Sequence, residues 1–64
     1  MYRLNVFHDG RTTPTQTVAL SQAGDVLTSI PMLLEQFPDC ARVEVTAGAV
    51  RLFSVDCKGN RIPS

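Results

Sequence analysis

His8 and the two cysteines, Cys40 and Cys57, are the residues of this chain whose types are best suited to chemistry. Catalysis by a nucleophile, or by an acid and a base, needs a second group that tunes the first. Asp9 follows His8, but neighbouring strand residues point to opposite faces, so the pair cannot cooperate as in a catalytic triad. Neither cysteine begins a helix or lies in an evident basic pocket that would favour its thiolate. We therefore expect no enzymatic activity and no catalytic residue.

The same residues do not form a metal or cofactor site. Zinc takes about four ligands, and His8 with two cysteines cannot supply them. The glycines at positions 10, 24, 48 and 59 lack the spacing of a phosphate-binding loop. We expect no metal, no cofactor and no small-molecule substrate.

Size and composition indicate one small domain, residues 1–64. Of the 64 residues 44% are apolar, which is typical of a globular protein. Six Lys and Arg balance six Asp and Glu, so the broad electrostatic attraction on which non-specific nucleic-acid binding depends is absent. Residues 1–5 lack the apolar region of a signal peptide, and no apolar run is long enough to cross a membrane. The sequence predicts a cytoplasmic protein with reduced thiols and no contact with a membrane.

The first third of the chain is predicted to form two antiparallel strands. Residues 2–7 alternate between apolar and polar faces, and residues 15–20 are rich in β-branched side chains. Asp9-Gly10 between them is a hairpin signal. A tight turn there would place the apolar side chains of the two strands on opposite faces, so we predict a bulge or irregular loop near residues 12–14.

A helical period follows, beginning at Asp25 and ended by Pro38. The residues that share its apolar stripe are Val26, Leu27, Ile30, Leu33, Leu34 and Phe37. Asp25 is predicted as the N-cap. Pro31 lies off the stripe, so we favour a long helix kinked at Pro31. The alternative is a shorter helix, capped by Ser29, with Pro31 in its first turn.

After Asp39 the sequence again alternates between apolar and polar residues, as in a strand. A turn at residues 47–48 would give the pairs Val45–Val50, Val43–Leu52 and Glu44–Arg51. This register also places the two cysteines diagonally on one face, which leaves their oxidation as an alternative. Residues 56–59 fit a type I turn, so residues 60–62 provide an optional fifth strand at the edge. The predicted fold class is α+β, an antiparallel sheet of four or five strands with one amphipathic helix on one face, in the order β-β-α-β-β.

The sheet face turned away from the helix is the candidate binding surface. Strand parity places on it Arg3, Phe7, Arg42, Glu44, Arg51, Phe53 and Val55. Aromatic and arginine side chains are enriched at binding hot spots. The alternative is that long arginine stems cover Phe7 and Phe53 on a solvated face.

The order of the predicted elements, together with three sequence segments, supports a resemblance to known proteins. It is carried by Ser-Gln-Ala-Gly-Asp at residues 21–25, Arg-Val-Glu-Val at residues 42–45, and residues 51–61, which end in Lys-Gly-Asn-Arg. In these segments the chain resembles small β-β-α-β-β proteins of phages and mobile elements, among them some anti-CRISPR proteins. The resemblance implies inhibition by occupying a surface of a large host nuclease complex, without catalysis.

We therefore expect a small binding module whose partner is a protein or a second copy of the chain. A core of this size supplies only about 3–5 kcal/mol, so a partner that covers surface would help to stabilise it. The alternatives are a structural homodimer formed through the open sheet face and a weak binder of single-stranded nucleic acid. Aromatic residues on an open sheet resemble the base-stacking surface of RNA-recognition domains, but their Gly-aromatic motif is absent.

Overall fold

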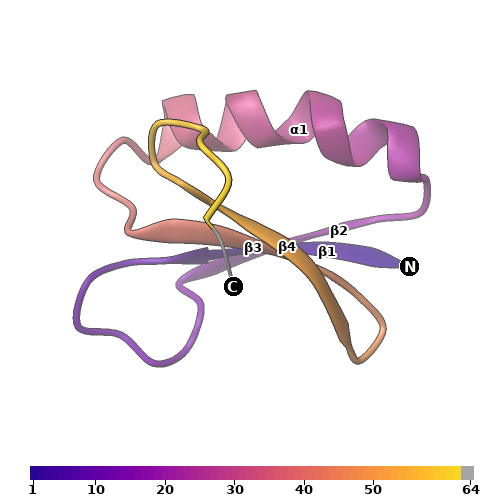
Figure 1. Ribbon diagram of the computed structural model, residues 1–64, viewed down its shortest axis with the longest axis horizontal. Helices are drawn as coiled ribbons and strands as arrows, with labels where there is room; N and C mark the ends of the chain where they lie inside the picture. Colours follow the sequence, from indigo (N-terminus) through magenta and orange to yellow (C-terminus); the bar gives the residue numbers. More distant parts are fainter. Residues whose placement is uncertain (63–64) are drawn as a thin grey trace.

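A four-stranded antiparallel sheet crossed on one face by a single helix forms the computed structural model of this chain (Figure 1), which describes residues 1–62. The elements in chain order are β1 (Tyr2–Phe7), β2 (Gln16–Leu20), α1 (Ala23–Gln36), β3 (Arg42–Ala47) and β4 (Val50–Asp56). The strands lie in the order β2-β1-β3-β4, so β1 and β3 are central and β2 and β4 are the edges. The predicted fold class and element order are confirmed.

An irregular loop of residues 8–15 joins β1 to β2. It begins with a β-turn in which Arg11 N–H donates to the His8 carbonyl at 3.2 Å and Gly10 has a φ of 79°. The loop sets the register that places Leu4 opposite Val18, so the apolar residues of both strands share a face. The predicted irregularity near residues 12–14 is confirmed, and Asp9-Gly10 does not connect the strands directly.

Helix α1 begins earlier than predicted and continues through Pro31. Its N-cap residue is Gln22, so the prediction that Asp25 is the cap was wrong. Asp25 lies in the first turn, where the partial positive charge of the helix N-terminus favours a carboxylate. Pro31 is exposed within the helix, which confirms the longer of the two predicted helices.

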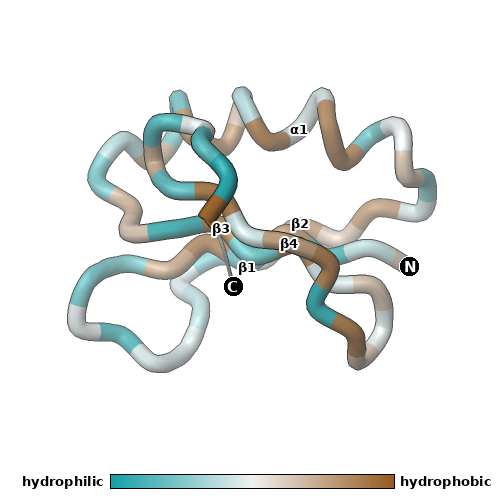
Figure 2. The backbone as a smooth tube through the Cα atoms, in the orientation of Figure 1, coloured by the Kyte–Doolittle hydropathy of each residue, from teal (hydrophilic) through white to brown (hydrophobic). Residues whose placement is uncertain are grey.

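The core lies between α1 and the two central strands. Its fully buried side chains are Leu4, Val6, Val43 and Val45. The helix contributes Val26, Ile30 and Leu33, and Figure 2 shows hydrophobic positions of α1 mainly on the side nearest the sheet. Leu27, predicted on the buried stripe, is 68% exposed because it lies about 100° around the helix from Val26.

The β3–β4 turn is formed by Gly48-Ala49, one position later than predicted. Gly48 has a φ of 62° and Ala49 does not have a positive φ, a pattern that fits glycine at the first central position of a type II′ turn. Ala47 then faces Val50 across the hairpin. The positive φ needed at this position favours glycine, and this explains the shift.

A β-bulge changes the register further along the same hairpin. The irregularity falls between Val45 and Thr46, and it leaves Leu52 as the extra residue of β4. Between the turn and the bulge, Thr46 faces Arg51. On the side of the bulge away from the turn, the pairs are Val45–Phe53, Glu44–Ser54 and Val43–Val55. The predicted pairs Val45–Val50, Val43–Leu52 and Glu44–Arg51 were therefore wrong.

The chain after β4 turns back along the outer edge of that strand. Gly59 N–H donates to the Asp56 carbonyl at 3.0 Å, which confirms the predicted turn. Arg61 forms an isolated bridge with Val55, and Ile62 N–H donates to the Ser54 carbonyl at 2.9 Å. This return is a single bridge, so the sheet has four strands instead of five.

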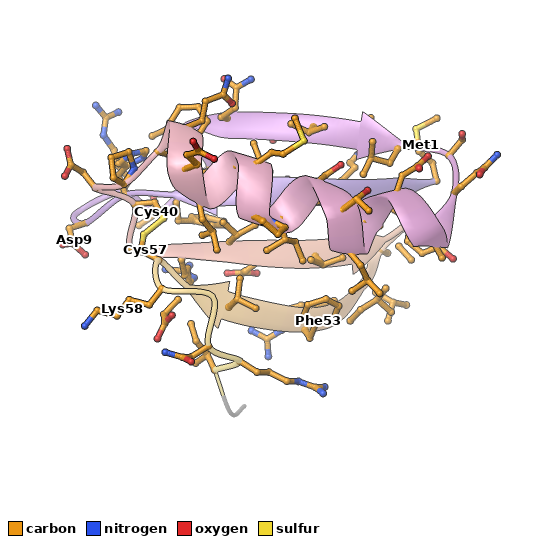
Figure 3. All side chains as sticks on the ribbon, turned by 90° about the horizontal axis from the view of Figure 1, so that it is seen from above. Met1, Asp9, Cys40, Phe53, Cys57 and Lys58 are labelled. Atoms are coloured by element: carbon orange, nitrogen blue, oxygen red, sulfur yellow. A yellow bond between two sulfur atoms is a disulfide. The ribbon has the colours of Figure 1, made fainter. Side chains whose placement is uncertain are left out.

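A disulfide joins Cys40 to Cys57 (Figure 3). Cys40 lies just before β3 and Cys57 just after β4, so the bond closes the end of the hairpin opposite its turn. The two Cα atoms are 5.7 Å apart. The expectation of reduced thiols was wrong for this structure, because pairing of Arg42 with Asp56 brings the two flanking cysteines within bonding distance.

Candidate binding surface on the open sheet face

The sheet face opposite α1, here called the open face, is formed by alternate residues of the four strands. Figure 1 shows α1 on one side of the sheet, while loop 8–15 and the far end of the β3–β4 hairpin curve toward the other side. The strand register places on the open face Arg3, Asn5, Phe7, Thr17, Arg42, Glu44, Thr46, Arg51, Ser54 and Asp56. Of the seven predicted contact residues, this face includes Arg3, Phe7, Arg42, Glu44 and Arg51.

Phe7 lies on the open face but is covered by Arg42. The Arg42 guanidinium carbon is 4.1 Å from the centroid of the Phe7 ring, a cation–π contact. Arg42 Nε also donates to Glu44 Oε2 at 2.8 Å, which fixes the guanidinium in place. Phe7 is only 8% exposed as a result. The alternative in which an arginine stem covers the aromatic ring is therefore confirmed for Phe7.

Phe53 and Val55 were predicted on the open face, and this placement was wrong. Val55 belongs to the core at 5% exposure, and Phe53 packs against the same cluster. The bulge at Leu52 adds one residue after Arg51, so β4 residues beyond it face the side opposite to the one predicted. Figure 3, seen from the helix side, shows Phe53 on β4 beside α1. The guanidinium carbon of Arg61 lies 5.6 Å from the centroid of its ring.

These placements leave the described part of the open face without an exposed aromatic ring. Phe7 is its only aromatic residue there, and Arg42 covers it. Stacking of nucleic-acid bases requires an accessible ring. The feature that suggested a nucleic-acid binder is therefore absent from the described surface.

Two exposed arginines remain on this face, and they are held in register. Arg3 of β1 lies opposite Thr46 of β3, which lies opposite Arg51 of β4. Neighbouring strands are about 4.8 Å apart, so the two arginine backbones stand about 10 Å apart. Asn5 Nδ2 donates to Thr46 Oγ1 at 3.5 Å. We call Arg3, Thr46 and Arg51 the arginine row.

The arginine row has no acidic partner within residues 1–62. The only ion pair there joins Arg42 to Glu44. Sequence reasoning missed Thr46, because Arg51 faces Thr46 only when the turn lies at Gly48-Ala49, whereas the predicted turn at residues 47–48 places Arg51 opposite Glu44. No signal in the chain marks the bulge, and the pairing of Arg3 with Thr46 follows from the observed register of β1 and β3.

Charge is unevenly distributed between the two sides of the molecule. Helix α1 contains Asp25 and Glu35 and no basic residue. The opposite side of the sheet presents Arg3 and Arg51. The open face carries three arginines, Arg3, Arg42 and Arg51, against two acidic residues, Glu44 and Asp56, so it is more basic than α1.

Asp56 organises the turn that follows β4. Its Oδ1 accepts hydrogen bonds from Asn60 N–H and Lys58 N–H, both at 2.9 Å. These backbone donors, that of Asn60 above all, lower the pKa of the Asp56 carboxyl below its ordinary value because they bind the charged form. Asp56 therefore holds the returning segment beside β4 as a carboxylate.

His8 fastens loop 8–15 to the rest of the molecule. Its Nδ1 lies 2.6 Å from Thr15 Oγ1, and that hydroxyl is 3.2 Å from the carbonyl oxygen of Val6. The imidazole also meets the ring of Phe37 edge to face, with centroids 6.2 Å apart. These contacts tie both ends of the loop to the end of α1.

Comparisons of this chain with protein-family models, curated proteins and solved structures find no match. Among residues 1–62, no group of three or more His, Cys, Asp or Glu side chains is placed to hold a metal ion. Within the same range, the structure contains no helix that combines the length and apolar character needed to cross a membrane.

Proposed function

We propose that this chain is a small, non-enzymatic module that binds a partner protein through the arginine row. The observation that carries the proposal is the pair of exposed arginines, Arg3 and Arg51, aligned across Thr46 on a helix-free sheet face. Arginine offers a planar fork of donors that matches a carboxylate in a bidentate arrangement. The matching partner surface is acidic.

The rigidity of the surface also supports binding. Both arginines project from paired strands, and Asn5 holds the Thr46 hydroxyl between them. A backbone held in a sheet loses less freedom on binding than the backbone of a loop, which leaves more of the contact energy for affinity. The acidic helix on the opposite side would be repelled by an acidic partner, so it favours approach by the open face.

The layout resemblance to anti-CRISPR proteins gives this proposal its most specific form. The partner would be a host nuclease complex, and the bound module would block the surface that it covers. A structural homodimer through the open face is less well supported, because face-to-face docking of two copies brings two arginine rows together.

The test compares partner capture by charge-reversal variants. Immobilised protein is incubated with extract of the native host, and captured proteins are quantified by mass spectrometry. We expect Arg3→Glu/Arg51→Glu to reduce capture of the specific partner by about tenfold or more, because two charge-assisted contacts become repulsive. The milder Arg3→Lys/Arg51→Lys variant should bind at an intermediate level, since lysine keeps the charge but loses the bidentate fork.

The matched control is Lys58→Glu/Arg61→Glu, which makes the same change in net charge outside the arginine row. It should retain the partner, and circular dichroism should show that both variants remain folded. Equal capture by the arginine-row variant and the wild type would contradict the proposal. Binding of a single-stranded oligonucleotide, abolished by the same variant and by salt, would favour the nucleic-acid alternative.

A further inference from the structure

The two edges of the sheet are protected to different degrees. On β4, Asp56 N–H donates to the Asn60 carbonyl at 2.8 Å and the Ser54 carbonyl accepts from Ile62 N–H at 2.9 Å. The rest of that edge carries the bulge and the charge of Arg51, and bulges and charges both discourage strand pairing. The other edge, β2, has no strand beside it in the described structure.

β2 also lacks the features by which edge strands usually avoid pairing. Its sequence, Gln-Thr-Val-Ala-Leu, contains no charged residue and no proline, and its register with β1 is regular. The uncharged stretch is longer than the strand, since residues 12–24 contain no Asp, Glu, Lys or Arg. A flat and uncharged edge is a ready template for another strand.

The hydrogen bonds of β1 show which groups of β2 are free. The Val6 carbonyl accepts from Thr15 N–H on the β2 side, whereas the Phe7 carbonyl accepts from Ala41 N–H on the β3 side. Because an antiparallel ladder alternates, Leu4 bonds toward Val18. The intervening residues of β2, Thr17 and Ala19, therefore direct their N–H and C=O groups away from the sheet.

We propose that a second copy of this chain pairs with β2 in antiparallel fashion, giving a two-fold dimer with one continuous sheet. A two-fold axis at Val18 places Val18 opposite its counterpart and Thr17 opposite Ala19 of the second copy. This register aligns the free N–H and C=O groups of both strands, as an antiparallel ladder requires. The edge is complementary to itself because no charge on either strand opposes a like charge.

The helix adds a second contact beside this edge. Of the strands, β1 and β2 approach the backbone of α1 most closely, so the two helices of the dimer would lie on the same face of the joined sheet, on either side of the two-fold axis. Leu34 points toward the β4 side, where its Cδ1 lies 3.5 Å from the position of a Cβ at Gly59. Met32 is on the opposite flank, above β2, and is 69% exposed in the single chain.

The two-fold axis brings both Met32 side chains toward the centre of the dimer, where they would cover each other. Asp25 lies near the start of α1, and antiparallel helices keep the two Asp25 carboxylates at opposite ends of the contact. The arginine rows stay accessible because β2 and β4 are at opposite edges of the sheet. The dimer thus stands independently of the proposed function and would present two arginine rows on one side.

The first test is sedimentation equilibrium over a wide range of protein concentration. The wild type should associate to a dimer. Ala19→Pro removes an outward N–H without removing a bond to β1, and it should raise the dimer dissociation constant about a hundredfold, since each dimer loses two such hydrogen bonds. Ala19→Val retains the N–H and should remain dimeric. Far-ultraviolet circular dichroism checks that both variants fold.

The second test examines the register by charge pairing. Thr17→Lys/Ala19→Lys and Thr17→Glu/Ala19→Glu should each be monomeric, because the register opposes like charges, and an equimolar mixture should form a heterodimer. A wild type that stays monomeric at all concentrations overturns the proposal, even if the edge captures an extended peptide of another protein. A dimer that survives Ala19→Pro, or that is lost in Arg3→Glu/Arg51→Glu, also overturns it.

Discussion

Arg42 and Arg51 carry the same side chain on the same sheet face, yet their environments differ completely. Arg42 is engaged twice, by the Phe7 ring at 4.1 Å and by Glu44 at 2.8 Å. Arg51 is exposed and has no such partner among residues 1–62. At the scale of the residue, the neighbours of an arginine decide whether it stabilises the fold or remains free to bind.

We expect the turn that follows β4 to be sensitive to acid, because it depends on the Asp56 carboxylate. Its pKa is lowered in the folded state by Asn60 N–H and Lys58 N–H, so its contribution to stability is present above the unfolded pKa, about 3.9. That contribution is lost as the pH falls through the lower, folded pKa. Urea unfolding measured from neutral pH down to pH values below this pKa should show the loss.

The control for this prediction is Asp56→Asn, which keeps an oxygen acceptor but cannot ionise. It should be less stable than the wild type at neutral pH, and the difference should shrink as the pH falls below about 4. A constant difference in unfolding free energy across this range would show that the Asp56 charge does not support the turn.

At the scale of the element, the bulge in β4 decides which side chains enter the core. Without Leu52, the turn at Gly48-Ala49 would still pair Thr46 with Arg51, and Phe53 would follow directly opposite Val45. We expect deletion of Leu52 to be tolerated, with the unfolding free energy within about 1 kcal/mol of the wild type, because every other pair is kept. Chemical denaturation of the purified variant provides the measurement.

Deletion of Ser54 is the matched control for the bulge. It would turn Val55 from the core toward the open face and expose a side chain whose burial contributes about 1.5–3 kcal/mol. This variant should be strongly destabilised or unfolded. If the two deletions destabilised the protein equally, the bulge would have no part in setting the face of each β4 residue.

In α1, substitution of Pro31 is expected to raise the stability of the protein. Proline inside a helix removes one hydrogen bond and clashes with the preceding turn, at about 3 kcal/mol, while it restricts the unfolded chain by about 1 kcal/mol. Pro31 is exposed, so Pro31→Ala loses no core contact and should stabilise the protein by about 2 kcal/mol. Thermal or urea unfolding tests this, and a destabilised variant would indicate that the proline fits a distortion the fold requires.

These elements also show how far the sequence could predict the structure. Periodicity predicted the elements and their order, and parity predicted the irregular loop before β2, because both depend on local patterns. The β3–β4 register depends on whether Phe53 or Leu52 packs under the helix, a choice made by contacts distant in sequence. The exposure of Leu27 likewise depends on how α1 lies over β1 and β2. The prediction placed Phe53 and Val55 on the wrong face because it had the wrong β3–β4 register. It placed Arg3 correctly because Arg3 lies in the first strand, before any turn whose position was uncertain.

At the scale of the whole molecule, the disulfide bears on the cellular compartment in which the protein resides. A cytoplasmic location remains a prediction, and the cytosol keeps most protein thiols reduced. Alkylation of free thiols at the moment of cell lysis, followed by mass spectrometry, measures the state of Cys40 and Cys57. Two alkylated cysteines are expected in the cytosol. An unmodified pair would indicate an oxidising compartment and contradict the cytoplasmic prediction.

The disulfide also bears on whether so small a chain can fold alone. It spans 17 residues of sequence, and a loop of this length corresponds to about 3 kcal/mol of stabilisation. A core of this size supplies only about 3–5 kcal/mol, so a dithiol reductant should leave the protein close to half unfolded under mild denaturing conditions. Urea unfolding with and without reductant measures the difference, and Cys40→Ala/Cys57→Ala, which cannot respond to reductant, is the control. A wild type whose unfolding free energy changes by less than about 1 kcal/mol on reduction would show that the reduced, unfolded chain retains contacts between the β3 and β4 segments.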